Sequence, residues 1–452
     1  MILKKCILNI SCNILFHKII ITFILIMCLI NFKVNWNNNN FEVNNFNENS
    51  LNKTINIGLV SRSIKNGGSE RSASLICHYF NKIKIFKLFL FTLQDKQKNE
   101  FYIDGNIERI VVKQDLIKVI NQTKIDILLY QLYDYRKIYE LNKLKNIKII
   151  IINRSCFLHW IYYDYYNIFK TYYKIYKNAE YAISLVPFEN DYLFRKWGVN
   201  SILISNFIPY EYNNITPSDL SSNLILMIGR GDDKTKRFDL GIKAMKHIIS
   251  EVAQCEMKII SSLDNISYLL KLKKELNLEN HVKFVGYTST PEIYFKNASI
   301  HLFPTLVESF GNVLTETKIH GIPNILVGLD YVSCSYGGTI IIYDDSPLSL
   351  ANVVIKILKN KRYRKKLGRD ARNSMKKFRN YLILKRWVKI ILAIYKGKEN
   401  YQKLRDEDKK LSEKDSIKLI QNQLNLLKRR KPKFNNISLN NIINFSFMEN
   451  LK

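Results

Sequence analysis

Two carboxylates, Glu308 and Glu316, have the spacing in this sequence that most clearly indicates chemistry, with seven residues between them. Glu308 falls in a predicted turn and Glu316 in the helix that follows, roughly 8 Å further along the axis. Between them, backbone N–H groups from about Phe310 to Val313 form the start of that helix, where a phosphate can bind. One carboxylate therefore flanks each side of a predicted phosphate site, the layout of a sugar, a diphosphate and a ribose. A charge-assisted hydrogen bond to such a hydroxyl contributes about 1.5–3 kcal/mol.

Two cations, Arg230 and Lys236, follow another predicted strand, at 223–228. The carboxyl ends of parallel strands meet at one edge of an α/β sheet, where ligands bind. Arg230 can hold a diphosphate there with its planar fork of donors, and Lys236 can add a point charge. The sequence thus supplies positive charge for the same predicted diphosphate.

The elements around the carboxylates are a strand, a turn, a helix and a second strand. Ser299–Phe303 is an apolar run followed by a proline, which cannot continue a sheet ladder. Ser309 or Gly311 can cap the helix, which is expected to run to about residue 320. Gly321 is expected in the left-handed conformation that ends helices. The next strand is expected to start at residue 325.

The first half of the chain shows the same alternation of strands and helices. A strand at 55–61 is followed by a loop containing Gly67 and Gly68, then by a helix that carries apolar residues to about Phe80. This order predicts a doubly wound α/β domain, and the glycines allow close approach of the backbone to a ligand or a simple tight turn. Further strands are predicted at 85–92, 110–112, 126–130, 147–152, 181–186 and 201–205.

The string PTLVESFGNVLTETKIHGIP resembles the E-x7-E element of family 4 glycosyltransferases, which have the GT-B fold of two Rossmann-like doubly wound domains facing a central cleft. The resemblance implies that Glu316 fixes the ribose of a nucleotide-sugar donor and Glu308 its sugar. It also implies that the backbone at Phe310, Gly311 and Asn312 binds the donor.

The segment GRGDDKTKRFDL resembles the family element in which an Arg and a Lys grip the donor diphosphate. Arg230 and Lys236 match these positions, and Gly229 precedes them at the donor site. The loop is one residue longer than usual and Arg237 replaces a frequent glycine, so Lys234 and Arg237 remain alternatives to Lys236.

Three further motifs extend the resemblance. Gly286, in FVGYT, matches a position where the donor base or phosphate approaches the backbone, and NGGSER, with Gly67 and Gly68, resembles the glycine-rich first loop over the cleft. His159 follows a strand end and is a candidate for orienting the acceptor or the sugar. A packed structural histidine among aromatic neighbours is the alternative.

Neither a metal nor a cofactor is expected. The seven cysteines show no CxxC or metal-ligand spacing, which also excludes a dense disulfide framework. Asp232 and Asp233 more naturally cap or balance their loop than bind a metal, and the resemblance implies a nucleotide sugar as substrate with no metal.

The chain has 452 residues and a formal net charge of +31. Its length suits two domains, and 47% hydrophobic and 12% aromatic residues are typical of a globular protein. Lysine is abundant everywhere and no arginine-rich stripe or aromatic RNA-binding motif is present, so nucleic acid is not an expected partner.

The N-terminal residues 1–33 are predicted to form an uncleaved hydrophobic membrane anchor, with a signal peptide or an interfacial anchor as alternatives. Residues 34–53 are an Asn-rich predicted linker. This N-terminus predicts a membrane-associated protein, of the endomembrane (ER or Golgi type) if eukaryotic, without fixing the side of the membrane.

The predicted domains are an acceptor-side domain at 54–215, a donor-binding domain at 216–395 whose last helix crosses back, and a charged, partly disordered tail at 396–452. The predicted function is transfer of a hexose-type sugar to an acceptor hydroxyl, with retention, in glycan biosynthesis. The acceptor is expected to be a glycan or lipid-linked. Whether a carboxylate acts as nucleophile or the leaving phosphate as base stays open. The alternative is a catalytically silent GT-B scaffold that binds a nucleotide or a partner at a membrane.

Overall fold

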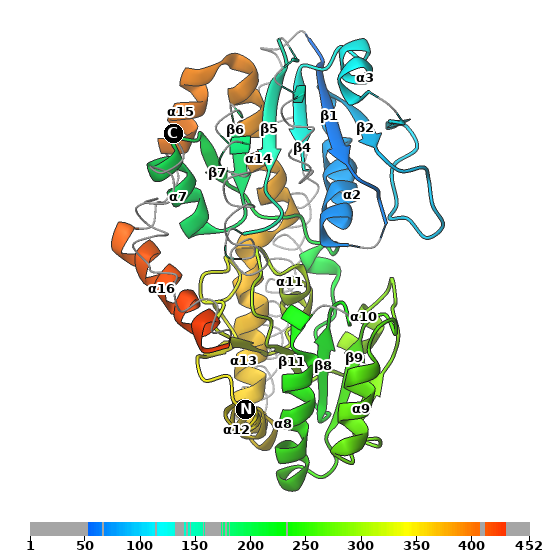
Figure 1. The fold of residues 1–452 in the computed structure, drawn as a ribbon, viewed down its shortest axis with the longest axis vertical. Coiled ribbons are helices and arrows are strands. Elements are labelled where there is room, and N and C mark those ends of the chain that lie inside the picture. Colours follow the sequence, from blue (N-terminus) through cyan, green and yellow to red (C-terminus); the bar gives the residue numbers. More distant parts are fainter. Residues whose placement is uncertain are drawn as a thin grey trace, which may run out of the picture. The chain divides into compact units, whose positions relative to one another are not determined.

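The fold is seen in a computed structural model, which describes residues 53–65, 67–113, 115–131, 140–141, 143–144, 146–156, 158, 173, 175–176, 179, 181–231, 234–406 and 412–430. The described residues from Thr54 onward belong to one compact unit, which contains two parallel sheets (Figure 1). Predicted residue His159 and the aspartates 232 and 233 lie outside the described residues.

The first sheet has the strand order β3-β2-β1-β4-β5-β6-β7, and all of its pairs are parallel. Its strands are β1 (Ile55–Ser61), β2 (Phe86–Thr92), β3 (Glu108–Val111), β4 (Ile127–Tyr130), β5 (Lys148–Ile152), β6 (Tyr181–Ser184) and β7 (Ser201–Leu203). β4 and β6 are buried along their whole length, as expected of central parallel strands covered on both faces. The order reverses between β1 and β4, which makes the edge above these two strands the switch point where ligands bind in such sheets.

The second sheet has the order β10-β9-β8-β11-β12-β13, again with parallel pairs throughout. Its strands are β8 (Leu224–Ile228), β9 (Glu256–Ile260), β10 (Val282–Phe284), β11 (Ile300–Phe303), β12 (Asn324–Val327) and β13 (Thr339–Ile342). The order repeats the pattern of the first sheet and reverses between β8 and β11. This doubly wound arrangement of two sheets confirms the predicted α/β fold class.

The helices follow the strands as the alternation predicts. They are α2 (Gly68–Phe80), α3 (Leu116–Gln122), α7 (Pro187–Trp197), α8 (Phe238–Glu251), α9 (Ser267–Glu275), α10 (Glu292–Phe295), α11 (Asn312–Ile319), α12 (Pro347–Lys359), α13 (Lys361–Ser374), α14 (Asn380–Lys396), α15 (Lys398–Asp406) and α16 (Glu413–Arg430). Within the described residues, 3-10 turns accompany them at η3 (Tyr212–Asn214), η4 (Lys234–Lys236) and η5 (Met375–Phe378). Local signals explain several boundaries. α7 begins at a proline and ends at Gly198 with φ of 63°, and α12 begins with Pro347 behind a Ser346 cap.

The second sheet packs around a core that α8 and α12 share with strands β8, β9 and β11. Gly241 of α8 lies directly against Met227 of β8, and a Cβ at this position would come within 2.3 Å of the Met227 sulfur. The missing side chain therefore lets the helix lie close to the sheet.

The chain from α14 to α16 packs against elements far away in the sequence. Trp387 of α14 contacts Phe80 of α2 edge-on, with ring centroids 5.5 Å apart. α16 lies within the segment predicted as a tail and has fully or almost fully buried leucines, Leu424 and Leu427. The part of that segment beyond residue 430 lies outside the described residues.

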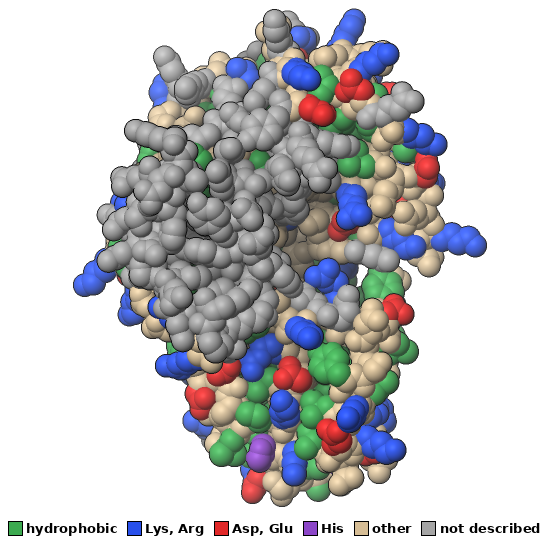
Figure 2. Space-filling view, in the orientation of Figure 1, with side chains coloured by type: hydrophobic (Ala, Val, Ile, Leu, Met, Phe, Trp, Pro, Cys, Tyr) green, Lys and Arg blue, Asp and Glu red, His purple; other side chains and the backbone are tan. Residues whose placement is uncertain are grey.

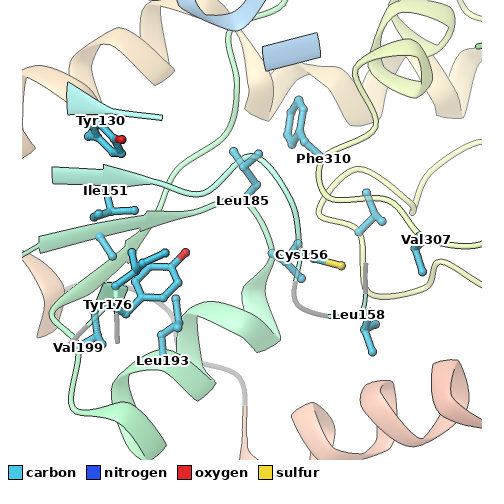
Figure 3. Packing of buried hydrophobic residues seen from close by; sticks show 14 of the residues in the cluster. Tyr130, Ile151, Cys156, Leu158, Tyr176, Leu185, Leu193, Val199, Val307 and Phe310 are labelled. Carbon is cyan, nitrogen blue, oxygen red and sulfur yellow. The ribbon is translucent and has the colours of Figure 1, made fainter. Parts of the chain in front are cut away.

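The largest hydrophobic cluster joins residues of both sheets. It combines side chains of β4, β5 and β6 with Val307 and Phe310 from the loop before α11 and with Leu424 of α16. Figure 3 shows Leu185 and Cys156 lying between the strands of the first sheet and that loop. This continuous core holds the loop before α11 against the carboxyl ends of the first sheet.

Charged side chains are spread over the surface. On the described part of the face in Figure 2, Lys and Arg side chains are interspersed with Asp and Glu and do not form one stripe.

The prediction of a membrane-associated protein with a single N-terminal anchor is wrong. Among the residues that the structure describes, none of the helices combines the length and the apolar character needed to cross a bilayer. Residues 1–33, where the anchor was predicted, lie outside the described residues.

Candidate active site

The candidate site lies at the switch point of the second sheet, where the loops after β8 and β11 leave neighbouring strands. The first loop carries Gly229 and Lys236, and the second carries Glu308. Gly229 packs under the Lys236 side chain, since a Cβ there would approach Lys236 Cγ to 3.2 Å. A glycine at the strand end therefore lets the lysine lie across it toward the second loop.

Lys236 and Glu308 form an ion pair, with 3.1 Å between Nζ and Oε2. Both side chains keep about a fifth of their surface exposed, at 19% and 22%. The ammonium also lies 5.8 Å from the centre of the Phe303 ring. The structure thus brings together the cation and the carboxylate predicted from two separate motifs.

The two alternatives to Lys236 are placed differently. Arg237 pairs with Asp345, with 2.9 Å between Nη1 and Oδ2, and Lys234 is exposed. Of the three cations, Lys236 is the one that pairs with Glu308 in the described structure, so the geometry favours Lys236.

The Glu308 loop is fixed by Tyr331, which follows β12. The backbone N–H of Glu308 donates to Tyr331 Oη at 3.0 Å, and the Ser309 N–H donates to the Glu308 carboxylate at 3.1 Å. Complete burial raises the pKa of Tyr331 well above its ordinary value, so the phenol stays protonated. A neutral, immobile acceptor therefore holds the peptide group of Glu308.

α11 begins directly after this loop, at Asn312, and ends where Gly321 takes the left-handed conformation that the sequence predicts, with φ of 70°. Gly311, its N-cap, is also left-handed, with φ of 76°. The side chain of Phe310 is buried and packs against Phe378, so only its backbone is available for a donor. The N–H groups at the start of α11 follow Glu308 closely in the chain, and such groups can bind an anion.

Glu316 lies in the second turn of α11 and pairs with Arg71 of α2, with 2.9 Å between Oε1 and Nη1. The carboxylate is almost completely buried, at 2% exposure, and the guanidinium side chain is 23% exposed. Burial raises the pKa of Glu316, Arg71 opposes the rise and Glu292 adds to it. Glu316 therefore depends on a residue of the first sheet's domain for compensation of its charge.

The glycine-rich loop of the first domain lies against the start of α11. A Cβ on Gly68 would lie 3.1 Å from the Asn312 amide nitrogen. The Glu70 carboxylate folds back over Gly67, where a Cβ would clash with it. Burial raises the pKa of Glu70, while Arg62 and Arg230 act in the opposite direction. Arg230 is therefore near enough to the glycine-rich loop for its charge to act on Glu70.

Hydrogen bonds also link strand ends of the first sheet to this helix. Asn206 donates to the Asn312 side chain at 3.0 Å, and Arg154 donates to Asn206. The Ser309 hydroxyl donates to the backbone carbonyl of Arg154 at 3.0 Å. The predicted donor helix therefore contacts the first domain through several polar groups.

Some residues stand apart from this constellation, and others were not predicted. Gly286 follows the edge strand β10 with φ of 80° and open space around its Cβ position. Arg71 is part of the NGGSER string, but nothing local in the sequence indicates a partner 245 residues away. Tyr331 and Asn206 likewise contact Glu308 and Asn312 over long sequence separations, and no sequence motif predicts these contacts.

Part of this chain is similar in sequence to known proteins. Residues 211–374 match the family described as Glycosyl transferases group 1. N-acetyl-alpha-D-glucosaminyl L-malate synthase from Bacillus anthracis is 25% identical over 180 residues, which cover 37% of this chain and 45% of that protein. The chain spans less than half the length of the curated relatives it matches.

Solved structures show the same fold. Sucrose-phosphate synthase from Thermosynechococcus elongatus matches with a TM-score of 0.64 and 16% identity, over 76% of this chain and 99% of that one. HepE from Anabaena, solved with UDP-glucose, matches with a TM-score of 0.63 and 14% identity, over 75% and 99%. These neighbours and the two doubly wound sheets confirm the GT-B fold. Residues 211–374 therefore match a glycosyl transferases group 1 domain, and the predicted resemblance to family 4 glycosyltransferases is confirmed.

Proposed function

We propose that this protein transfers a hexose-type sugar from a nucleotide-sugar donor to an acceptor hydroxyl, with retention of configuration. The observation that carries the proposal is the ion pair between Lys236 and Glu308 beside the start of α11. A donor bound there has its diphosphate next to a cation and free N–H groups, and its sugar next to a carboxylate.

In this proposal the main catalytic contribution is electrostatic. Negative charge develops on the diphosphate as the bond to the sugar breaks, and Arg230, Lys236 and the N–H groups near Gly311 stabilise it. Preorganised donors of this kind are typically worth about 10²–10³ in kcat each. The Lys236–Glu308 pair places the lysine before the donor arrives, so little reorganisation is needed.

Glu308 is assigned to the sugar and Glu316 to the ribose. Because the Glu308 peptide group is held by Tyr331, the carboxylate is positioned by the backbone as well as by Lys236. Retention and the acceptor class, a glycan or a lipid-linked sugar, are parts of the proposal that come from the family resemblance. HepE was solved with UDP-glucose, which makes UDP-sugars the first donors to test.

The first experiment is a thermal-shift screen of the full chain against UDP-, GDP- and ADP-sugars, followed by an assay of nucleotide release with the best donor. Glu308→Gln should lower kcat by about 10²–10³ while leaving the Kd of the nucleoside diphosphate within about threefold, because the substituted group meets the sugar and not the diphosphate.

Glu279→Gln, which changes an exposed glutamate of the same domain, is the matched control and should behave as the unaltered chain. Full activity of Glu308→Gln would contradict the assignment. Donor binding without transfer or hydrolysis in the unaltered chain would instead favour the catalytically silent scaffold.

A further inference from the structure

We propose that Arg71 is a positioning residue for donor recognition, holding Glu316 as an anion so that Glu316 accepts hydrogen bonds from a ribose diol. This inference rests on the proposed function and deepens it. It assigns a residue of the first domain to the donor site, and it expects the site to select ribonucleotides over 2′-deoxyribonucleotides.

The geometry has two parts. Arg71 lies in the first turn of α2, directly after the glycine-rich loop that packs against Asn312. Its Nη1 reaches the Glu316 Oε1 at 2.9 Å. Among the described residues, Arg71 is the hydrogen-bond donor that the structure shows for the Glu316 carboxylate. An ionised carboxylate offers about four lone-pair sites on its two oxygens, so capacity for two hydroxyl donors remains.

The surroundings of Glu316 make its ionisation costly. The side chain is 2% exposed, and a second carboxylate, Glu292 of α10, acts on it with the same sign of charge. Tyr210 donates to Glu292 at 3.0 Å. Burial raises the pKa of Tyr210, and the negative charge of Glu316 raises it further. His320, the residue that follows α11, meets the backbone carbonyl of Glu316 through Nδ1 at 2.7 Å. Arg71 is thus the cation that compensates this carboxylate within the described part of the site.

The chemistry explains why the charge matters for a ribose. A carboxylate accepts from both hydroxyls of a diol, whereas a protonated carboxyl spends one oxygen as a donor. Hydrogen bonds to an ionised acceptor are also roughly twice as strong as neutral ones. Loss of Arg71 should therefore weaken ribose recognition by favouring protonation of Glu316.

The test uses the nucleoside diphosphate, among UDP, GDP and ADP, that most stabilises the unaltered full chain, together with its 2′-deoxy analogue. Isothermal titration gives Kd for the unaltered chain, Arg71→Met and Arg71→Lys between about pH 6 and pH 9. Below the raised pKa of Glu316, affinity that requires the anion falls by up to about tenfold per pH unit. The Arg71→Met defect should therefore be largest at low pH and shrink toward pH 9, with a loss of preference for the ribonucleotide.

The control for a general loss of charge is Lys84→Met, which removes an exposed cation of the same domain. Arg71→Lys keeps the charge, so its affinity should fall less than that of Arg71→Met and should depend less on pH. A double-mutant cycle separates positioning from direct contact. In a Glu316→Gln background, Arg71→Met should cost less than about threefold in Kd, because the charge through which it acts is already gone.

Each outcome decides the inference. Suppose that Arg71→Met loses affinity for the diphosphate to the same extent at every pH, and loses as much again when Glu316 is already Gln. Arg71 would then contact the donor directly or only support the fold, and the inference would be overturned. Unchanged affinity in Arg71→Met would overturn it as well. If none of the three diphosphates binds the unaltered chain, the proposed function itself fails, and the inference with it. If Arg71→Met does not fold, two other proteins still test the inference. One is Arg71→Lys, and the other is the double variant of Arg71→Met with Glu316→Gln, in which neither member of the pair carries a charge.

Discussion

Leu424 of α16 offers a direct test of whether the C-terminal helix belongs to the folded core. The side chain is fully buried, and it belongs to the same cluster as β4, β5 and the loop before α11. Replacing a buried leucine by alanine costs about 2–5 kcal/mol, because transfer energy is lost and a cavity remains. Leu424→Ala should therefore lower the free energy of unfolding by an amount in this range.

The assay is urea unfolding followed by far-UV circular dichroism and by tryptophan fluorescence, since Trp197 is buried in the same cluster. Lys418→Ala, at an exposed position on the same helix, is the matched control and should change the unfolding free energy by no more than about 0.5 kcal/mol. If Leu424→Ala is as stable as the control, α16 does not pack as described and the reasoning is refuted. A solvated tail would give that result.

Two further predictions concern charge and metal. Lys318 is buried, donates to the carbonyls of Cys334 and Tyr336 at 2.6 Å each, and has its pKa lowered by burial to about 8 from the ordinary 10.5. The unfolded chain binds more protons than the folded chain between these values, so the unaltered protein should gain stability as pH rises from about 8 to about 10.5. Lys318→Met should lack this gain in stability, and it should be destabilised by about 1–3 kcal/mol at neutral pH because two buried carbonyls lose their donor. Urea unfolding of both proteins at about pH 7.5 and pH 9.5 measures the two effects. Equal pH dependence of the two proteins would contradict the lowered pKa of Lys318. Treatment with EDTA should leave sugar transfer within about twofold, because the diphosphate charge is assigned to protein groups, and a loss restored by Mg²⁺ would show that a metal takes part.

The sequence predicts this fold well where the pattern is local. The sequence predicts the order of elements from β11 to β12 and places their ends to within about two residues, because the apolar runs, Gly321 and the prolines each determine the backbone around them. β13 was not predicted, since four residues after two glycines give too short a pattern to distinguish a strand from a loop. The leucines of α16 have helical spacing, but helical periodicity does not say which surface the apolar face covers.

The site shows the same division. Glu308, Lys236 and the start of α11 could be placed together because each follows a strand end of one doubly wound sheet, and such ends converge. Arg71 could not be placed in the site from the sequence, because its partner Glu316 belongs to another domain. That pairing depends on how the loops of the two sheets meet. The support of Glu308 by Tyr331 was missed for a similar reason, because it is made through a backbone N–H group, which is the same in every residue type except proline.

The hydrogen bonds that join α11 to the first domain have a consequence for turnover. Asn206, Arg154 and Arg71 each bond to α11 or to the loop before it from a different part of the other domain. If the proposed function holds, we expect a spent nucleotide at α11 to leave only after several of these hydrogen bonds open. We therefore expect departure of the nucleotide, rather than bond breaking at the sugar, to limit the steady-state rate, as in many enzymes with closing elements. Added viscogen should then slow steady-state turnover while leaving the first catalytic cycle unaffected.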